Sequence, residues 1–164
     1  MRNSKTPVTC RGLLFLMKIE DEIKQSKFID AYQKAGINLI YTTNWLLGKQ
    51  LDFFKSFGIT PSQFNILRIL KGQYPKSISA TEIKSRMLDR NSDVSRMVER
   101  LISKNLISKK ICPIDKRASD ILITQEGLDL LKAIDKHQHQ LDRILSLTAD
   151  EATLLSDLLD KIRG

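Results

Sequence analysis

Three segments of the chain begin with the same helix-start pattern. Each has a hydroxyl residue followed three positions later by Gln or Glu, the spacing of a capping box, in which each side chain bonds to the other residue's backbone. The pairs are Thr60 with Gln63, Ser79 with Glu82, and Thr148 with Glu151. The pattern predicts helices over about 60–72, 79–88 and 148–162.

A fourth amphipathic segment lies between Asp89 and Lys104. We expect this helix to be capped by Asn91 or Ser92 and to end at Asn105, because Asn tolerates the left-handed conformation that closes helices. Its apolar stripe is Val94, Met97, Val98, Leu101 and Ile102. The residues expected outside are Asn91, Ser92, Ser95, Arg96, Glu99, Arg100 and Lys104.

Two short strands are predicted next, over 106–112 and 118–124, with a charged tip at 113–117 between them. A helix, a short joint at 89–92, a second helix and a basic hairpin together form a winged helix-turn-helix. The DNA major groove is about 12 Å wide and accepts one α-helix, whose first residues meet the base edges. The expected fold class is therefore mainly α, with a short β-hairpin wing.

The candidate major-groove residues are Asn91, Ser92, Ser95 and Arg96. The first three are small and polar and would let the helix enter the groove, while an Arg has the forked donors to bind guanine or a phosphate. In the alternative interpretation, Asn91 and Ser92 are only caps, and Arg96 pairs with Glu99 or Glu82.

The hairpin tip carries Lys116 and Arg117, which suit the narrow and negative minor groove. Asp115 would repel phosphate, and we expect it to brace an arginine. The alternative for Lys116 and Arg117 is an ordinary charged turn.

Charge is distributed unevenly along the chain, whose net charge is +8. Residues 57–123 hold thirteen Lys or Arg against six Asp or Glu, whereas residues 124–164 hold five against eight. A basic segment of this kind is typical of a protein that binds a polyanion, although a solvated surface has the same composition.

The remaining segments are expected to be helical and to hold two copies together. From 19 to 57 the apolar residues cover a wider arc than one core contact needs, and the helix capped by Thr124 has apolar residues up to Ile144. We expect a disordered tail at 1–18 and one domain at 19–164. Within it, 59–123 would bind DNA, and 19–57 with 124–164 would form a helical dimerisation region.

Several other classes of protein are excluded. The longest apolar run has five residues, too short for a membrane span or a secretory signal, so we expect a cytoplasmic protein. Two cysteines cannot build a disulfide framework, and His137 and His139 diverge on a helix, which argues against structural zinc. No nucleophile with a base, carboxylate pair or phosphate-binding glycine loop is visible, so we expect neither an enzyme nor a cofactor.

The stretch from Val94 to Leu131 resembles the MarR family of winged-helix regulators, most specifically in Asp115-x-Arg117 and in Leu122-x-Thr124-x-x-Gly127. The resemblance implies a homodimer that binds double-stranded, inverted-repeat operators and in many members releases them on binding a small ligand or on oxidation. It also implies that Asn91, Ser92, Ser95 and Arg96 contact the major groove and that Arg117 enters the minor groove. Asn105 stands where the family usually has glycine.

The expected function is a sequence-specific transcriptional regulator, acting as a repressor, with an effector that the sequence does not identify. The alternative is a winged-helix module for protein contacts. Tyr32, Tyr41 and Trp45 would line an effector pocket or belong to the core or the dimer interface. Cys112 would be either a reactive thiol, activated by nearby lysines, or an inert strand residue, and Cys10 lies in the expected tail.

Overall fold

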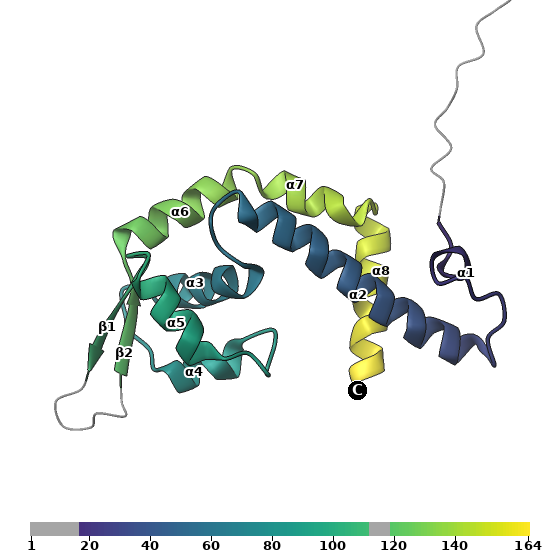
Figure 1. Ribbon diagram of the computed structural model, residues 1–164, viewed down its shortest axis with the longest axis horizontal. Helices are drawn as coiled ribbons and strands as arrows, with labels where there is room; N and C mark the ends of the chain where they lie inside the picture. The colour runs from purple at the N-terminus through teal and green to yellow at the C-terminus, as the bar shows by residue number, and fades with distance from the viewer. Residues whose placement is uncertain (1–16, 112–118) are drawn as a thin grey trace, which may run out of the picture. The chain divides into compact units, whose positions relative to one another are not determined.

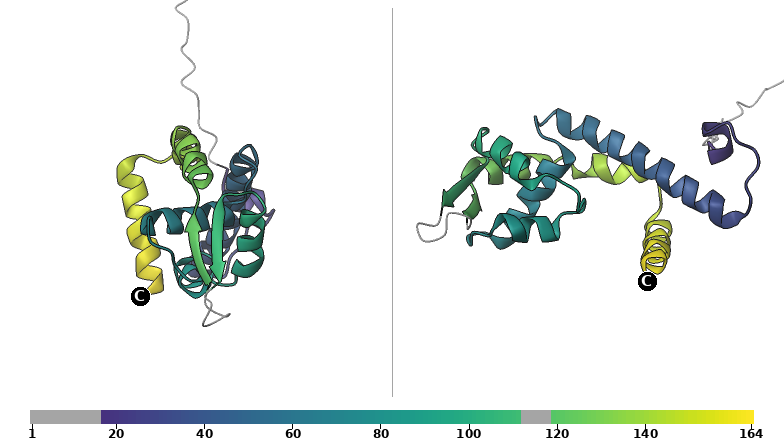
Figure 2. Two further views of the ribbon diagram at one scale, coloured as in Figure 1. Left: turned by 90° about the vertical axis from the view of Figure 1, so that its left-hand side faces the viewer. Right: turned by 60° about the horizontal axis from the view of Figure 1, so that its bottom comes forward.

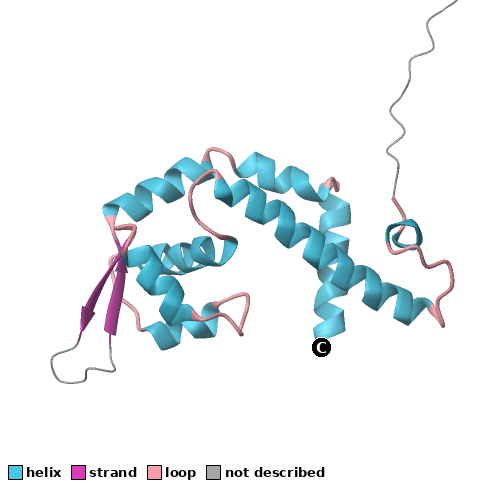
Figure 3. Ribbon diagram, in the orientation of Figure 1, coloured by secondary structure: helices cyan, strands magenta, loops and turns pink. Residues whose placement is uncertain are grey.

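The computed structural model of the chain describes residues 17–111 and 119–164. They divide into two compact units, one up to Asn44 and the other Trp45–Gly164. The described residues are mainly helical with one two-stranded sheet, which confirms the expected fold class (Figures 1 and 3). The helices are α1 (Ile19–Glu22), α2 (Ala31–Lys55), α3 (Pro61–Gln73), α4 (Ala80–Arg86), α5 (Val94–Ile102), α6 (Gln125–Asp135), α7 (Gln138–Asp142) and α8 (Ala149–Arg163), with a 3-10 turn, η1, at Arg143–Leu145. The strands are β1 (Ile107–Ile111) and β2 (Ser119–Ile123).

The segment 19–57, expected to be helical, does not form one long helix. The chain leaves the helix after α1, where Lys24 has a φ of 53°, and starts again at Asp30, whose Oδ1 accepts the Gln33 N–H at 2.7 Å. Glu20 pairs with Lys34, and this partner holds the pKa of Glu20 below its usual value. Of the expected tail 1–18, residues 1–16 lie outside the described residues.

All three capping boxes are confirmed. At the start of α3, the Thr60 N–H donates to Gln63 Oε1 at 3.1 Å and the Gln63 N–H donates to Thr60 Oγ1 at 3.2 Å. The same reciprocal pairs begin α4 and α8. Because each box satisfies backbone groups that a helix end would leave unpaired, the local sequence alone fixes where these helices begin.

The fourth helix, α5, has the predicted apolar stripe, with Val94, Val98 and Leu101 buried. Its predicted cap is wrong: Asp93, not Asn91 or Ser92, accepts the Arg96 N–H at 3.1 Å. The joint between α4 and α5 is therefore residues 87–93, longer than the expected four residues. Asn105 has the predicted left-handed conformation, with a φ of 57°, but α5 itself ends three residues earlier, at Ile102.

The hairpin pairs Ile107 with Ile123 and Lys109 with Ile121 in antiparallel register, and Figure 2 shows the strands side by side. Ile78, which precedes α4, bridges to Ile121 through two backbone hydrogen bonds of 2.9 and 3.1 Å. The wing is thereby fastened to the helix-turn-helix. The tip of the hairpin lies outside the described residues.

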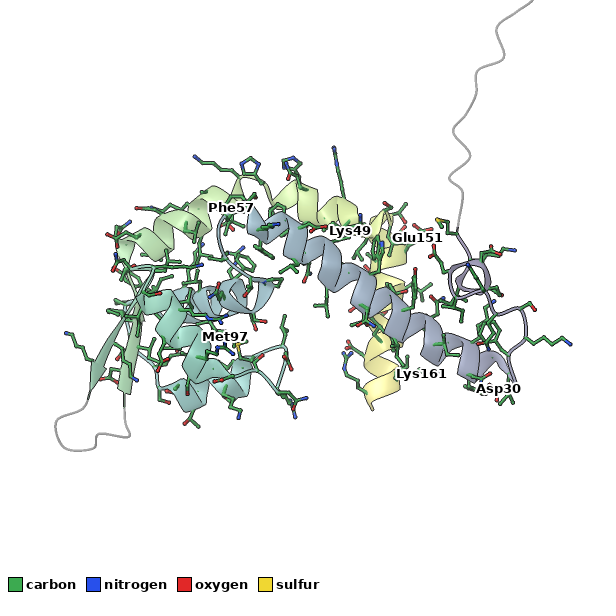
Figure 4. The ribbon with its side chains drawn as sticks, viewed as in Figure 1. Asp30, Lys49, Phe57, Met97, Glu151 and Lys161 are labelled. Atoms are coloured by element: carbon green, nitrogen blue, oxygen red, sulfur yellow. The ribbon has the colours of Figure 1, made fainter. Side chains whose placement is uncertain are left out.

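After the wing, α6 packs closely on the hairpin at Gly127. A Cβ there would lie 2.3 Å from the Leu106 carbonyl oxygen and 2.7 Å from Ile123 Cγ1, so only glycine fits without movement. The helix predicted from Thr124 to Ile144 is interrupted after α6. It continues as α7 and η1, with the His137 ring at the break 5.9 Å from that of Phe57, which Figure 4 labels.

One apolar core joins these elements. Its fully buried side chains come from α3 to α6 and the strands: Ile66, Leu67, Leu70, Ile83, Leu101, Ile121, Ile123, Leu131 and Ile134. Arg68 and Lys71 of α3 both pair with Asp135 of α6, at 2.7 and 3.2 Å. This core fixes α5 and the wing on a common support.

Candidate nucleic-acid interface

The predicted contact residues gather at the amino end of α5. Asn91, Ser95 and Arg96 are exposed and Ser92 is half-buried, while Val94 and Val98 face the core. The burial pattern therefore presents one polar surface around the first turn of α5, the helix labelled in Figure 1. Lys116 and Arg117, with Asp115 and Cys112, lie outside the described residues, as does Cys10.

Arg96 does not make the ion pairs of the alternative interpretation. Glu82 lies 4.0 Å from Arg86 instead, and its carboxylate caps α4. This carboxylate accepts a hydrogen bond from the Ser79 backbone N–H, which holds the pKa of Glu82 below its usual value. Neither Glu82 nor Glu99 is within ion-pair distance of Arg96. The guanidinium therefore stays available to an external anion or base edge.

Ser92 has a structural role other than the predicted helix cap. Its hydroxyl donates to Asp89 Oδ2 at 2.9 Å, so it stabilises the joint without being the helix cap. The Asn91 backbone N–H donates to the other oxygen, Asp89 Oδ1, at 2.9 Å. Asp89 therefore holds two of the four predicted major-groove residues.

The helix-turn-helix and the wing expose further cations that the sequence argument did not single out as DNA contacts. Lys84 and Arg90 are exposed, and Lys109 and Lys110 are exposed on β1. Arg90 could have been found from the sequence, since it directly precedes Asn91. Lys104, in contrast, donates to the Gly58 carbonyl and serves the fold.

A cavity of about 400 Å³ opens beside the joint, within the Trp45–Gly164 unit. Its walls are mostly apolar and come from the end of α2, from α3, from the joint and from α7 with η1. The lining includes Phe54, Phe64, Met87, Leu88, Leu141 and Leu145, with Asn65, Arg68 and Asp89 as polar members.

Tyr32, Tyr41 and Trp45 are not among the residues that line this cavity. Tyr41 donates to Glu22, which raises the pKa of the phenol, and Tyr32 is exposed. The described residues bring together no group of three or more possible metal ligands. They also contain no helix long and apolar enough to cross a membrane.

The comparison with known proteins agrees with this geometry. The MarR family model matches residues 59–119. The HTH-type transcriptional regulator MhqR of Bacillus subtilis is 28% identical over 109 residues, which are 64% of this chain and 72% of that protein. The HTH-type transcriptional repressor MdtR of the same organism is 35% identical over 79 residues, 48% of this chain and 50% of that protein.

Solved structures give the same result over most of the chain. A MarR transcription factor from Planctomyces limnophilus has a TM-score of 0.64 and 26% identity, covering 82% of this chain and 98% of that one. A mutant MarR from Escherichia coli in complex with operator DNA has a TM-score of 0.69 and 25% identity, covering 85% and 100%. These relatives are transcription regulators, and residues 59–119 of this chain match the MarR family of transcriptional regulators.

Proposed function

We propose that this regulator is a homodimer that binds inverted-repeat operator DNA through the amino end of α5. Asn91, Ser92, Ser95 and Arg96 would contact the major groove, and Lys116 and Arg117 of the wing would enter the minor groove. The observation that carries the proposal is the exposed Arg96, beside the small Ser95 and free of Glu82 and Glu99.

The chemistry of this surface suits DNA better than a protein partner. An arginine that no carboxylate among residues 17–111 and 119–164 neutralises keeps its five donors for guanine O6 and N7 or for phosphate oxygens. Lys84 of α4 and Arg90 of the joint are also exposed, and the net charge of residues 57–123 is +7. We propose that these two cations contact phosphates, which position the helix without reading sequence.

The dimer is supported by two helices that bury almost nothing within the described chain. Helix α8 has 15 residues and buries none of them, and α2 has 25 residues and buries only Phe54. A helix of 15 residues is only marginally stable alone in water, so contact with another surface must stabilise α8. Its exposed apolar residues are Leu154, Leu155, Leu158 and Ile162.

We assign this contact to a second copy, through residues 19–57 and 124–164. A two-fold dimer places the two recognition helices about 34 Å apart, one turn of DNA, so the half-site centres should be about ten base pairs apart. Such an operator is a pseudo-palindrome. Because the target is chromosomal DNA, the regulator would act in the cytoplasm.

Repression and a response to a small ligand complete the proposal. MdtR, a relative, is named a transcriptional repressor. The cavity beside the joint has about the volume of a small-molecule site and mostly apolar walls with a few polar groups. A ligand bound there would contact Leu88 and Asp89, two residues of the joint that precedes the proposed DNA surface.

Selection of bound duplexes from a random DNA pool by the full chain tests the proposal. We expect an enriched inverted repeat, bound with an affinity that falls steeply as salt rises, because phosphate contacts release counterions. Enrichment of no sequence, together with affinity that is indifferent to salt, would instead support the alternative of a winged-helix module for protein contacts.

A further inference from the structure

The joint between α4 and α5 is anchored by a buried residue at each end, and the residues between them are mostly polar and exposed. Met87 and Val94, at its two ends, are each 5% exposed and belong to the core. Between them, Leu88 is 90% exposed, so apolar packing does not fix this part of the backbone. Hydrogen bonds must therefore set its path, and with it the direction in which the amino end of α5 points.

Asn65 of α3 holds the start of this path. Its Oδ1 accepts the Leu88 N–H at 3.0 Å, although the two residues are 23 positions apart in sequence. Its neighbours on the helix, Ile66 and Leu67, are completely buried. The bond therefore connects the first exposed residue of the joint to a rigid part of the core.

Asp89 stabilises the next part of the joint, residues 89–92, through hydrogen bonds. Its two carboxylate oxygens accept the Asn91 N–H and the Ser92 hydroxyl, each at 2.9 Å, and its carbonyl accepts the Ser92 N–H at 3.3 Å. This is the pattern by which an aspartate side chain closes a turn over the residues that follow it. Both engaged residues belong to the proposed DNA-contact set.

We infer that Asn65 and Asp89 are positioning residues for DNA recognition: they fix the joint that presents Asn91, Ser92 and the first turn of α5. The inference rests on the proposed function. A carboxylate at this place also repels DNA phosphates, so the charge of Asp89 and its positioning role affect binding with opposite signs. The two effects can therefore be separated by experiment.

The experiment compares the full chain with D89A, D89N and E99Q on two probes: the duplex selected by the unchanged protein, and a scrambled duplex of equal length and composition. For D89A we expect at least about tenfold weaker binding to the selected duplex, equal to about 1.4 kcal/mol, with unchanged or tighter binding to the scrambled one. D89N should keep most of the selectivity, because its amide oxygen still accepts the Asn91 N–H.

The Glu99 variant is the matched control, since it removes a carboxylate from the exposed face of α5 without touching the joint. We expect E99Q to strengthen binding to both duplexes by the same factor. If D89A and D89N also strengthen both equally, Asp89 acts through its charge alone and the inference is wrong.

Asn65 is tested in the same way. N65A should lose selectivity, and N65D, which keeps an oxygen acceptor for the Leu88 N–H, should retain it relative to N65A. Equal selectivity in the two variants would contradict the role of this hydrogen bond.

Amide hydrogen exchange without DNA provides the independent readout. We expect N65A to speed the exchange of the Leu88 amide and D89A that of Asn91, while Leu101 in the core exchanges as before. If the unchanged protein selects no sequence, the proposed function fails and the DNA role of the joint fails with it. If selection succeeds and D89A keeps its selectivity, only the inference is overturned.

Discussion

Removing apolar side chains from α8 should separate the two copies of the proposed dimer. Leu154 is 60% exposed and Leu158 is 51% exposed in the single chain. Complete burial of a leucine side chain is worth roughly 1.5–3 kcal/mol, so covering the remaining half of each contributes about 1 kcal/mol. A dimer contains each residue twice. The L154A/L158A variant should therefore lose about 4 kcal/mol of association free energy, which is about a thousandfold in the dissociation constant.

Sedimentation velocity over a dilution series measures this constant. The matched control is S156A, which lies on the same helix, is exposed and removes no apolar area; it should dimerise like the unchanged protein. Circular dichroism at high concentration checks that the variants remain helical. A double variant that dimerises as tightly as the unchanged protein would refute the reasoning, as would an unchanged protein that is monomeric at micromolar concentration.

Four further results are expected. R96A should lose about 1–3 kcal/mol of binding free energy on the selected duplex and should show a relaxed sequence preference, as measured by fluorescence anisotropy. An equal loss on scrambled DNA would show that Arg96 contacts the DNA backbone. R117A should weaken binding to all sequences alike and reduce the slope of log K against log salt by about one, and an unchanged slope would contradict the wing contact. G127A should lose about 1–3 kcal/mol of stability in urea, because its Cβ would meet the Leu106 carbonyl, while G36A, whose Cβ meets nothing within 4 Å, should not be destabilised. Backbone and side-chain hydrogen bonds from Ser79 and Thr148 hold the pKa values of Glu82 and Glu151 below 4.5, so the stability that these caps contribute is complete above that pH and is lost as pH falls through the lowered values. In urea unfolding at pH 7 and pH 3, the free energy of unfolding of E82Q/E151Q should fall less on acidification than that of the unchanged chain.

The helix starts were predictable because their causes are local. A capping box needs two side chains three positions apart, so it is complete within the sequence of one turn. The cap of α5 was not predictable in the same way, since Asn91, Ser92 and Asp93 are consecutive and all three residue types are good caps. The choice of Asp93 places Val94 at the first helical position, where it is buried in the core.

The helix interruptions were missed for a related reason. Leu131, Ile134 and Leu141 keep one helical spacing across the break between α6 and α7, because a short interruption hardly changes the phase of the apolar residues. At the other break, the pair Asp30 and Gln33 was a readable start signal that the long apolar arc obscured. Periodicity indicates which residues face the core, and it does not show whether the helix between them is continuous.

The surface that we propose for DNA binding depends on both local and distant interactions. Small polar residues at the start of a helix were recognisable from the sequence, but the hydrogen bond from Leu88 to Asn65 connects positions 23 residues apart and follows only from the packing of α3. The alternatives for Ser92, structural cap or DNA contact, were too narrow: its hydroxyl is a donor to Asp89, and each lone pair left on its oxygen can still accept a bond from outside. A residue that stabilises the joint therefore does not cease to be available to DNA, and a variant at this position must be judged by selectivity and not by affinity alone.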